Sequence, residues 1–468
     1  MRAVATTSAD LVVLGAGPAG LAAAWRAAQG GRSVVVLERA DSAGGMAASF
    51  EVAGVRVDHG SHRLHPATPP HVMSALRGLL GDDLQTRPRN GRLRIGDRWV
   101  GFPLRVDDLL RALPPRTVAG IARDAVTGVA RRPRSDTYDE VLRAGLGSTL
   151  YEALYAPYAV KLWGLDPTRI SGEQARRRVT ADTPWKVAAR VLRGARGNGQ
   201  GQVFHYPRGG FGQIVDVLAA AAVDAEADVR LGHAVDAVVT DGARPLVSAG
   251  ASSVEAGRVF STIPLTALAR VCSPAAPPAV VEAASALRFR AMVLVYLVHD
   301  GGRWTPFDAH YLPGLGTPVT RLSEPANYRL SADDPTDRTV LCAEIPCTIG
   351  DSIWSATDAD LAAVVTEALA MQGLPAIALS TVAVRRLPNV YPVYEVGFER
   401  HLEQLADWAD GLPGVTTFGR LGLFVHDNTH HALAMAWDAA AAVQPDGSWD
   451  AAAWSAAKAR FANHVVED

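Results

Sequence analysis

Residues 10–38 have the sequence DLVVLGAGPAGLAAAWRAAQGGRSVVVLE, and this stretch decides the fold. Its first part, DLVVLGAG, is a continuous apolar run that predicts a buried strand, and SVVVLE predicts a second one. The Ala-rich segment between them predicts a helix that ends at Gly30 and Gly31. Two parallel strands joined by a helix form one βαβ unit with a right-handed crossover. The stretch therefore predicts an α/β protein with a dinucleotide-binding domain.

The turn between the first strand and the helix, GAGPAG at 15–20, matches the pattern GxGxxG. Gly15 permits the tight turn, Gly17 lets the backbone approach a pyrophosphate, and Gly20 allows the helix to pack closely on the strand. The helix N-terminus offers unpaired N–H groups and a positive dipole end to the phosphates. Because the pattern lies between a strand and a helix, a nucleotide site is favoured over a ligand-free glycine turn. We expect a nucleotide to contact Gly15, Gly17, Pro18, Ala19, Gly20, Glu38 and Arg39, with Glu38 accepting hydrogen bonds from ribose hydroxyls.

Composition excludes several classes of protein. The 468 residues include 46 basic and 48 acidic ones, so the net charge of -2 creates no global field that favours nucleic acid or an anionic membrane. Three cysteines without a CxxC pair argue against a disulfide framework or a zinc knuckle. No run approaches the roughly 18 apolar residues of a membrane span, and the first apolar stretch runs directly into GAGPAG, so its cleavage would destroy the fold. We therefore expect a cytoplasmic protein.

The rest of the chain predicts a second domain that interrupts the nucleotide domain. Residues 70–195 have a largely helical pattern, and the Gly-rich segment 194–202 predicts a linker. Apolar segments at 291–300 and 339–347 predict strands of a second sheet. We expect residues 1–75, 200–285 and 395–468 to form the nucleotide-binding domain, and residues 76–199 and 286–394 to form an α+β substrate domain that includes a helical insertion.

Two segments after the first βαβ unit resemble the FAD-binding folds of the glutathione-reductase type. Gly44 and Gly45 form a doublet like the second glycine motif of these folds. The loop HGSHRLHP at 59–66 carries His62 at the place where this superfamily approaches the flavin ring. The resemblance implies a discontinuous FAD-binding Rossmann domain of the glutathione-reductase type.

Two later segments extend the resemblance to both ends of the cofactor. The segment DVRLGHAVDAVVT at 228–240 contains Val235 and matches a strand whose backbone meets adenine. The turn GRLG at 419–422 precedes a helix that starts at Asn428 or Thr429, in a position that faces the flavin's pyrimidine edge. The resemblance thus implies FAD contacts at Gly44, Gly45, Met46, His62, Val235, Gly419, Arg420, Asn428 and Thr429.

The only cofactor we expect is FAD, bound non-covalently. None of the three cysteines falls in a matched flavin segment. His426, His430 and His431 could suggest a metal, but no carboxylate stands at a supporting spacing, so we expect these residues to cap a helix and contact the flavin instead.

Landmarks along nearly the whole chain resemble the amine-oxidase and protoporphyrinogen-oxidase-like superfamily, in the branch that contains UDP-galactopyranose mutase. Their order and spacing together are specific. The landmarks are GAGPAG, HGSHRLHP, WVGFPL, YAPYAVKLWGLDP, YPRGGFGQI, TRLSEPANY, YPVYEVGFERHL and GRLGLFVHDNTHH.

The resemblance to mutases also implies a substrate pocket. Two aromatic residues match positions that line the nucleotide pocket of mutases. Two arginines match the residues that bind the diphosphate, and the first of them stands at one of two adjacent positions. A tyrosine matches a residue that contacts the phosphate. Converging arginines would stabilise the charge of a diphosphate leaving group. The alternatives are that Trp163 packs the helical insertion and that Arg177 lies on a solvated helix face. The implied pocket residues are Tyr158, Trp163, Arg177 or Arg178, Arg321, Tyr391 and His426, the last of which stands where mutases tend to have tyrosine.

The motifs favour an FAD-dependent oxidoreductase that acts on a small molecule, such as a nucleotide-linked sugar or a biosynthetic intermediate, by hydride transfer to flavin N5. We expect His62 to orient the substrate or handle a proton, with Arg321 as the second catalytic residue. The alternative is a redox-neutral isomerase of a nucleotide sugar that uses reduced flavin. A non-catalytic flavoprotein is disfavoured because it would not need the arginines and aromatic residues of the pocket.

Overall fold

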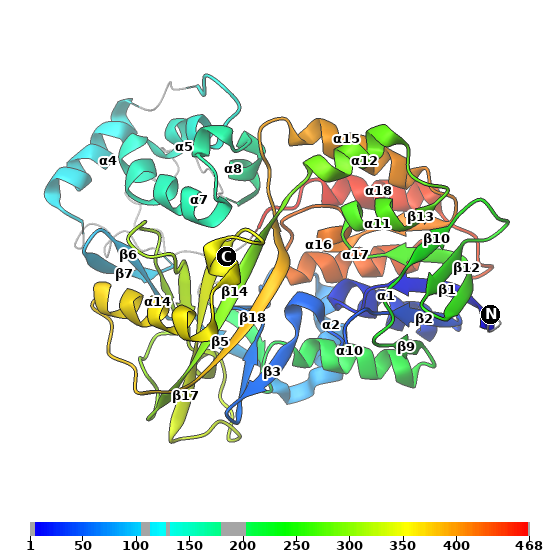
Figure 1. The fold of residues 1–468 in the computed structure, drawn as a ribbon, viewed down its shortest axis with the longest axis horizontal. Helices are drawn as coiled ribbons and strands as arrows, with labels where there is room; N and C mark the ends of the chain where they lie inside the picture. The colour runs from blue at the N-terminus through cyan, green and yellow to red at the C-terminus, as the bar shows by residue number, and fades with distance from the viewer. Residues whose placement is uncertain (1–4, 104–112, 128–131, 179–202, 467–468) are drawn as a thin grey trace.

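Two large sheets, two small two-stranded sheets, the helices that cover them and a helical region make up the described part of the chain. The computed structural model describes residues 5–103, 113–127, 132–178 and 203–466. Figure 1 shows the helical region beside one sheet, with the larger sheet on the other side of the molecule. The predicted linker at 194–202 lies outside the described residues, as does part of the predicted helical stretch. The predicted α/β class is confirmed.

The larger sheet has eight strands in the order β13-β10-β11-β12-β1-β2-β9, with β19 also pairing with β12. Strand β1 is parallel to both β2 and β12, and helix α1 (Pro18–Gln29) connects β1 to β2. The predicted βαβ unit is therefore confirmed, and strands from distant parts of the chain complete its sheet. The strands are β1 (Ala5–Leu14), β2 (Val34–Leu37), β9 (Asp228–Arg230), β10 (Ala237–Val239), β11 (Leu246–Ala249), β12 (Ser252–Ser261), β13 (Cys272–Ser273) and β19 (Val415–Thr417).

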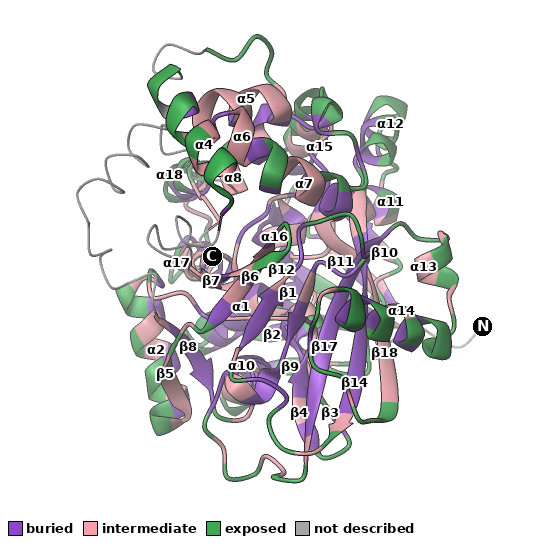
Figure 2. Ribbon diagram, turned by 90° about the vertical axis from the view of Figure 1, so that its left-hand side faces the viewer, coloured by how far each residue is buried: buried purple, intermediate pink, exposed green. Residues whose placement is uncertain are grey.

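Side chains of β1 alternate between two cores because successive residues of a strand point to opposite faces. Leu11 and Val13 join one core, and Val12 and Leu14 join the other. Full burial of each such side chain contributes about 1.5–3 kcal/mol. Figure 2 shows these strands buried between helices, which explains the unbroken apolar run in the sequence. The first core lies under α1, α10 (Gln213–Asp224), α17 (Thr429–Ala441) and α18 (Ala451–Phe461), and the second under α11 (Leu265–Val271), α12 (Pro278–Ala286) and α15 (Phe398–Asp410).

The second sheet has seven strands in the order β18-β14-β17-β16-β15-β6-β7. Neighbouring strands are antiparallel except for β15 and β6. Helix α14 (Asp358–Met371) packs on one face of this sheet. The strands predicted at 291–300 and 339–347 are confirmed as parts of β14 and β17. The bounds are β6 (Gly91–Ile95), β7 (Arg98–Phe102), β14 (Phe289–Asp300), β15 (Ala309–Tyr311), β16 (Arg321–Ser323), β17 (Arg338–Cys347) and β18 (Leu379–Pro392).

The prediction that residues 70–195 are largely helical is partly wrong. After α2 (Pro70–Leu80), the chain forms β5 (Leu84–Pro88), β6 and β7 before it enters the helical region. In β6, Leu93 and Ile95 are buried whereas Arg92 and Arg94 are partly exposed. This two-residue period is typical of a half-buried strand, and the arginine-rich composition around it concealed the signal.

A helical insertion is present within this range. Its core contains Tyr138, Leu142, Tyr151, Trp163 and Ile170. The boundaries of the two predicted domains stay a prediction. The helices are α4 (Pro115–Thr127), α5 (Tyr138–Leu146), α6 (Ser148–Leu150), a π-helical segment at Tyr151–Tyr155, α7 (Ala156–Trp163) and α8 (Gly172–Arg178). The remaining elements that position the site are β3 (Ser49–Val52), β4 (Val55–Asp58), β8 (Val203–Pro207) and α16 (Gly419–Gly422). None of the helices formed by described residues has the length and hydropathy needed to cross a membrane.

Lys161 on α7 ties the helical insertion to the second sheet. Its buried Nζ donates to the carbonyls of Leu312 at 2.5 Å and Val319 at 2.8 Å. Because burial penalises the charged form, the pKa of the Lys161 ammonium falls to about 7. Among the residues that the structure describes, Lys161 is therefore held by carbonyl groups rather than by a carboxylate.

We expect this amine to make stability rise with pH. The unfolded chain keeps Lys161 protonated up to about pH 10.4, so between pH 7 and 10 it binds more protons than the folded chain. Relative to Lys161→Met, the wild-type free energy of unfolding should gain up to about 1.4 kcal/mol per pH unit in this window. Urea unfolding at pH 7, 8 and 9 measures the difference. Parallel pH profiles for the two proteins would contradict the assignment.

Candidate active site

The turn from β1 into α1 requires glycine at two positions. Gly15 has φ +99°, and a Cβ there would lie 2.7 Å from the Thr262 Oγ1. A Cβ on Gly20 would lie 1.9 Å from the Gly15 carbonyl oxygen. The Gly15 N–H donates to the Leu37 carbonyl at 2.8 Å and joins the turn to β2. Glycine at these positions thus lets the helix approach the strand as closely as the pattern predicts.

An open cradle lies at the N-terminus of α1. Within the described ranges no side chain caps the first turn of α1, and a Cβ on Gly17 would meet no atom within 4 Å. A Cβ on Gly45 would meet only the Gly17 Cα, at 3.7 Å. The Gly44 N–H donates to the Ala16 carbonyl at 2.8 Å, which holds the glycine doublet against the first turn. Free N–H groups beside open space suit a diphosphate.

The carboxylate of Glu38, at the end of β2, bonds to the turn between β1 and α1. One of its oxygens accepts from the Ala16 N–H at 2.8 Å and the other from the Ala40 N–H at 2.9 Å. Arg39, by contrast, is exposed. A hydrogen-bonded carboxylate beside the diphosphate cradle is the group that would meet ribose hydroxyls.

The prediction that Val235 lies in a strand is wrong. Val235 belongs to the connection between β9 and β10. In the larger sheet β9 is the last strand on one side and β10 is the second strand from the other side, and the connection between them includes Gly232, whose φ is +69°. The His233 N–H donates to the Glu38 carbonyl at 2.7 Å, so this connection still runs beside the end of β2.

The loop that carries His62 is connected to the glycine doublet. The Nδ1–H of His59 donates to the Gly45 carbonyl at 3.1 Å, and the Nε2–H of His62 donates to the His59 carbonyl at 3.0 Å. The His62 ring stacks on Phe211 with 5.1 Å between centroids. Burial lowers the pKa of His62, so its imidazole is neutral at neutral pH. Met46 lies partly buried in the same region.

Asp58 anchors this loop and was missed in the sequence. Its buried carboxylate accepts from the Ser49 hydroxyl at 2.6 Å, from the Phe211 N–H at 2.9 Å and from the Tyr206 hydroxyl at 2.5 Å. Its place directly before HGSHRLHP was the available signal.

The second helix expected at the flavin begins where predicted. Helix α17 starts at Thr429, and Asn428 forms a reciprocal capping box with His431. The preceding turn packs against α1, since a Cβ on Gly419 would lie 3.2 Å from the Ala19 Cβ. Helices α1 and α17 lie side by side (Figure 1). The glycine turn, the cradle, the carboxylate and this second helix together fit an FAD.

Five predicted residues from four distant segments meet around Tyr391 on β18. The Tyr391 ring lies 5.6 Å from the Trp163 ring and 6.4 Å from the His426 ring. The guanidinium carbons of Arg178 and Arg420 lie 5.0 Å and 5.2 Å from its centroid. We call Trp163, Arg178, Tyr391, Arg420 and His426 the Tyr391 cluster.

The Tyr391 cluster carries two positive charges. Among the described residues neither Arg178 nor Arg420 forms an ion pair, and Arg420 donates instead to the carbonyls of Asp427 at 3.3 Å and Val390 at 2.9 Å. Burial, followed by the charges of Arg178 and Arg420, holds the pKa of His426 well below its usual range. His426 is 2% exposed and neutral, and within the described part of the chain neither ring nitrogen makes a hydrogen bond of normal geometry. Such a site favours an anion.

The structure distinguishes Arg177 from Arg178. Arg177 donates to the Glu173 carboxylate at 2.7 Å and to the Ala462 carbonyl at 3.2 Å, whereas Arg178 lies over Trp163 and Tyr391. Arg178 is therefore the member of the pair that joins the cluster, and Arg177 holds the structure around it. Tyr158 packs at the edge of the helical core that contains Trp163.

Arg321 has a carboxylate partner. Its Nη2 lies 2.8 Å from both oxygens of Glu344, which also accepts from the Ser61 N–H at 2.8 Å. Although burial opposes the charge, the attraction of Glu344 and then of nearby tyrosines, including Tyr391, raises the pKa of Arg321 further. Arg321, through its ion pair with Glu344, thus links the His62 loop to the neighbourhood of Tyr391. That Arg321 takes part in catalysis or binds a diphosphate stays a prediction.

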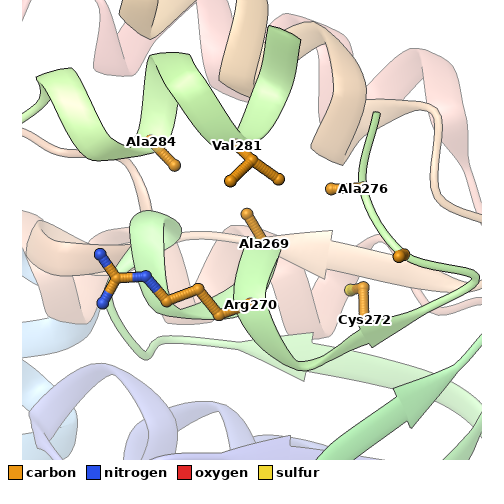
Figure 3. A pocket seen from close by; sticks show the side chains of 7 residues that line it. Ala269, Arg270, Cys272, Ala276, Val281 and Ala284 are labelled. Atoms are coloured by element: carbon orange, nitrogen blue, oxygen red, sulfur yellow. The ribbon is translucent and has the colours of Figure 1, made fainter. Parts of the chain in front are cut away.

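A cavity of about 260 Å³ lies away from these residues. It is bordered by α11 and α12, on the sheet face opposite α1 (Figure 3). Burial raises the pKa of the Cys272 thiol in its wall to about 11, which keeps the thiol protonated and unreactive. Its lining is Ala269, Arg270, Cys272, Ala275, Ala276, Val281 and Ala284, and offers no catalytic constellation.

Comparison with known proteins gives a match to a family and to similar sequences. The model of the flavin-containing amine oxidoreductases matches residues 18–396. A Mycobacterium tuberculosis protein described as the flavin-containing monoamine oxidase AofH is 31% identical over 274 residues. The match covers 54% of this chain and 57% of AofH, so the chain spans little more than half of that relative.

Several solved structures have a similar fold. Reduced UDP-galactopyranose mutase superposes with a TM-score of 0.79 at 19% identity, over 98% of this chain and 100% of that chain. A protein described as a protoporphyrinogen oxidase from Exiguobacterium sp. 255-15 gives 0.71 at 17%, over 98% and 100%. Putrescine oxidase bound to putrescine gives 0.67 at 18%, over 93% and 99%. At these identities the likeness concerns the fold.

Proposed function

Because the chain belongs to the flavin-containing amine oxidoreductase family, we propose that it is an FAD-dependent oxidoreductase whose substrate is a small anionic molecule, such as a nucleotide-linked sugar or a biosynthetic intermediate. The observation that supports an anion is the Tyr391 cluster, where Arg178 and Arg420 flank a neutral histidine. At an effective dielectric constant of 20, a unit charge about 4 Å away contributes about 4 kcal/mol. A protonated amine would be repelled there, and a phosphate or carboxylate attracted.

The groups around the glycine turn support FAD, bound non-covalently. The first turn of α1 and the glycine doublet would hold the diphosphate, and Glu38 would hold the ribose. When bound, the flavin supplies a two-electron acceptor. His62 remains the residue we propose to orient the substrate or handle its proton, since its neutral imidazole is fixed by the His59 carbonyl.

A redox-neutral mutase of a nucleotide sugar is the second candidate. The arrangement of Arg178, Trp163 and Tyr391 supports it, because a diphosphate leaving group needs a positive site lined by aromatic rings. The two candidates differ in electron balance: an oxidoreductase reduces its flavin stoichiometrically with substrate, whereas a mutase consumes no reductant.

The first test is a titration of the flavin's visible spectrum with UDP, UDP-galactose and putrescine, in oxidised and reduced protein. We expect a saturable perturbation by the two anions and none by putrescine. Perturbation and bleaching by putrescine alone would contradict the proposal. Anaerobic product analysis then separates the candidates, since turnover of UDP-galactose only after flavin reduction, without further reductant, identifies the mutase.

A further inference from the structure

Residues 462–466, which follow α18, return to the edge of the Tyr391 cluster. The Ala462 carbonyl accepts from Arg177 at 3.2 Å, and the Val466 N–H donates to the Arg177 carbonyl at 2.8 Å. Between these two contacts, the Nδ1–H of His464 donates to the Asp427 carboxylate at 2.6 Å. The segment thus holds two chain positions that lie far apart in the sequence.

Both positions are next to members of the cluster. Arg177 directly precedes Arg178, and Asp427 directly follows His426. The Asp427 carbonyl, moreover, accepts from Arg420 at 3.3 Å. A displacement of the Asp427 backbone would therefore move the backbone that carries His426 and disturb a contact of Arg420.

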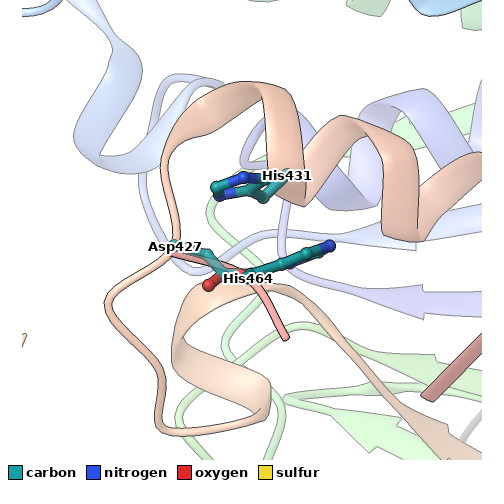
Figure 4. Close-up of side chains that lie close together, drawn as sticks. All are labelled: Asp427, His431 and His464. Carbon is teal, nitrogen blue, oxygen red and sulfur yellow. The ribbon is translucent and has the colours of Figure 1, made fainter. Parts of the chain in front are cut away.

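His464 is well placed to prevent that movement. The Asp427 side chain is 4% exposed, so its hydrogen bond is shielded from water. The His464 ring also lies over the His431 ring (Figure 4). The ring centroids are 4.2 Å apart and the planes differ by 15°. Burial and then the neighbouring His430 lower the pKa of His431 to about 3, which keeps the stacked partner uncharged.

We propose that His464 is a positioning residue, which through Asp427 fixes His426 and Arg420 against Tyr391. The inference rests on the proposed function, because the Tyr391 cluster is the proposed anion site. Substrate affinity would then depend on a residue that does not touch the substrate. Nothing in the spacing of the sequence places position 464 beside position 427.

A metal site is the competing assignment for the same residues. Asp427, His431 and His464 each offer one ligand atom, and these atoms lie within 4.8 Å of one another. An imidazole binds a metal along the lone pair in its ring plane, however, and the planes of these two rings are nearly parallel and separated, so lone pairs lying in them do not readily meet at one ion. The Nδ1 of His431 already accepts from the Asn428 N–H at 3.3 Å. The arrangement therefore suits hydrogen bonding better than shared coordination.

The test compares His464→Phe, which keeps the ring stack but loses the hydrogen bond, with His464→Gln, which keeps a donor. Lys458→Ala on α18, whose ion pair with Asp410 lies at the surface, is the matched control. Each FAD-loaded protein is titrated with UDP by flavin absorbance, and amide exchange is followed in residues 419–431. In His464→Phe we expect the Kd for UDP to rise about tenfold and amide exchange to accelerate, with FAD content unchanged. His464→Gln should recover most of the UDP affinity and most of the protection from amide exchange, and Lys458→Ala should match the wild type in both.

The outcomes separate this inference from the proposed function. If UDP leaves even the wild-type flavin unperturbed, the anion site fails, while faster exchange in His464→Phe alone still supports the positioning role. If both amide exchange and UDP affinity are unchanged in His464→Phe, the positioning role of His464 is overturned. Stoichiometric Zn²⁺ binding by the wild type but not by His464→Phe, measured by calorimetry, also overturns it and identifies a metal site.

Discussion

Replacing Gly17 by alanine is expected to remove the flavin but keep the fold, whereas replacing Gly20 by alanine is expected to break the fold itself. At Gly17 the backbone angles of φ -76° and ψ 178° suit alanine, and the added methyl group meets no protein atom. It would occupy the space where the diphosphate approaches the backbone. We expect FAD affinity to fall about 100-fold or more, equivalent to about 2.7 kcal/mol.

At Gly20 the same methyl group collides with the protein. Its carbon would lie 1.9 Å from the Gly15 carbonyl oxygen and 3.2 Å from the Val13 Cγ1, so α1 must move away from β1. Such overpacking costs about 3 kcal/mol or more, a large part of the about 5–15 kcal/mol that stabilises a typical protein.

Three measurements separate these effects: flavin content after purification, FAD titration of the apoprotein, and urea unfolding. Gly78→Ala is the matched control, because a Cβ on this helical residue of α2 meets open space and should raise stability by up to about 1 kcal/mol. A Gly17→Ala protein with full flavin content, or a Gly20→Ala protein as stable as the wild type, would show that the cradle is assigned wrongly.

Arg178→Ala is expected to lower affinity for an anionic ligand by ten- to a hundredfold. A hydrogen bond to a charged group contributes about 1.5–3 kcal/mol, and the lost guanidinium has no described carboxylate partner to leave behind. Titration with UDP by flavin absorbance measures the change, and Arg178→Lys should restore part of it by keeping the charge without the planar fork.

Arg176→Ala is the control for this experiment. Arg176 lies on the same helix, two residues earlier, with 47% of its side chain exposed and paired to Asp136 and Glu173. An exposed pair contributes about 0–1 kcal/mol, so UDP affinity should not change. Equal losses in the Arg176 and Arg178 variants would indicate general damage to α8 rather than loss of an anion contact.

Local backbone patterns made the cofactor half of the protein predictable. The βαβ unit, the glycine turn and the start of α17 at Thr429 each depend on a few consecutive residues, whose conformations follow from missing side chains, apolar periodicity and helix caps. The same local signals failed for the arginine-rich strands β6 and β7, where the period extends over only five residues. They failed also at Val235, which lies in the connection between two strands, β9 and β10, that are far apart in the sheet.

The sequence by itself determined the Rossmann unit and its glycine turn, because these features arise from neighbouring residues, and its resemblance to flavoproteins indicated a flavin. Only the tertiary structure decided which charges meet. It separated Arg178 from Arg177, paired Arg321 with Glu344, and brought His464 to Asp427 across 37 positions. Sheet pairing and helix packing place these residues together, and both depend on contacts between distant segments. The proposed anion site is therefore a property of the folded chain rather than of any single motif.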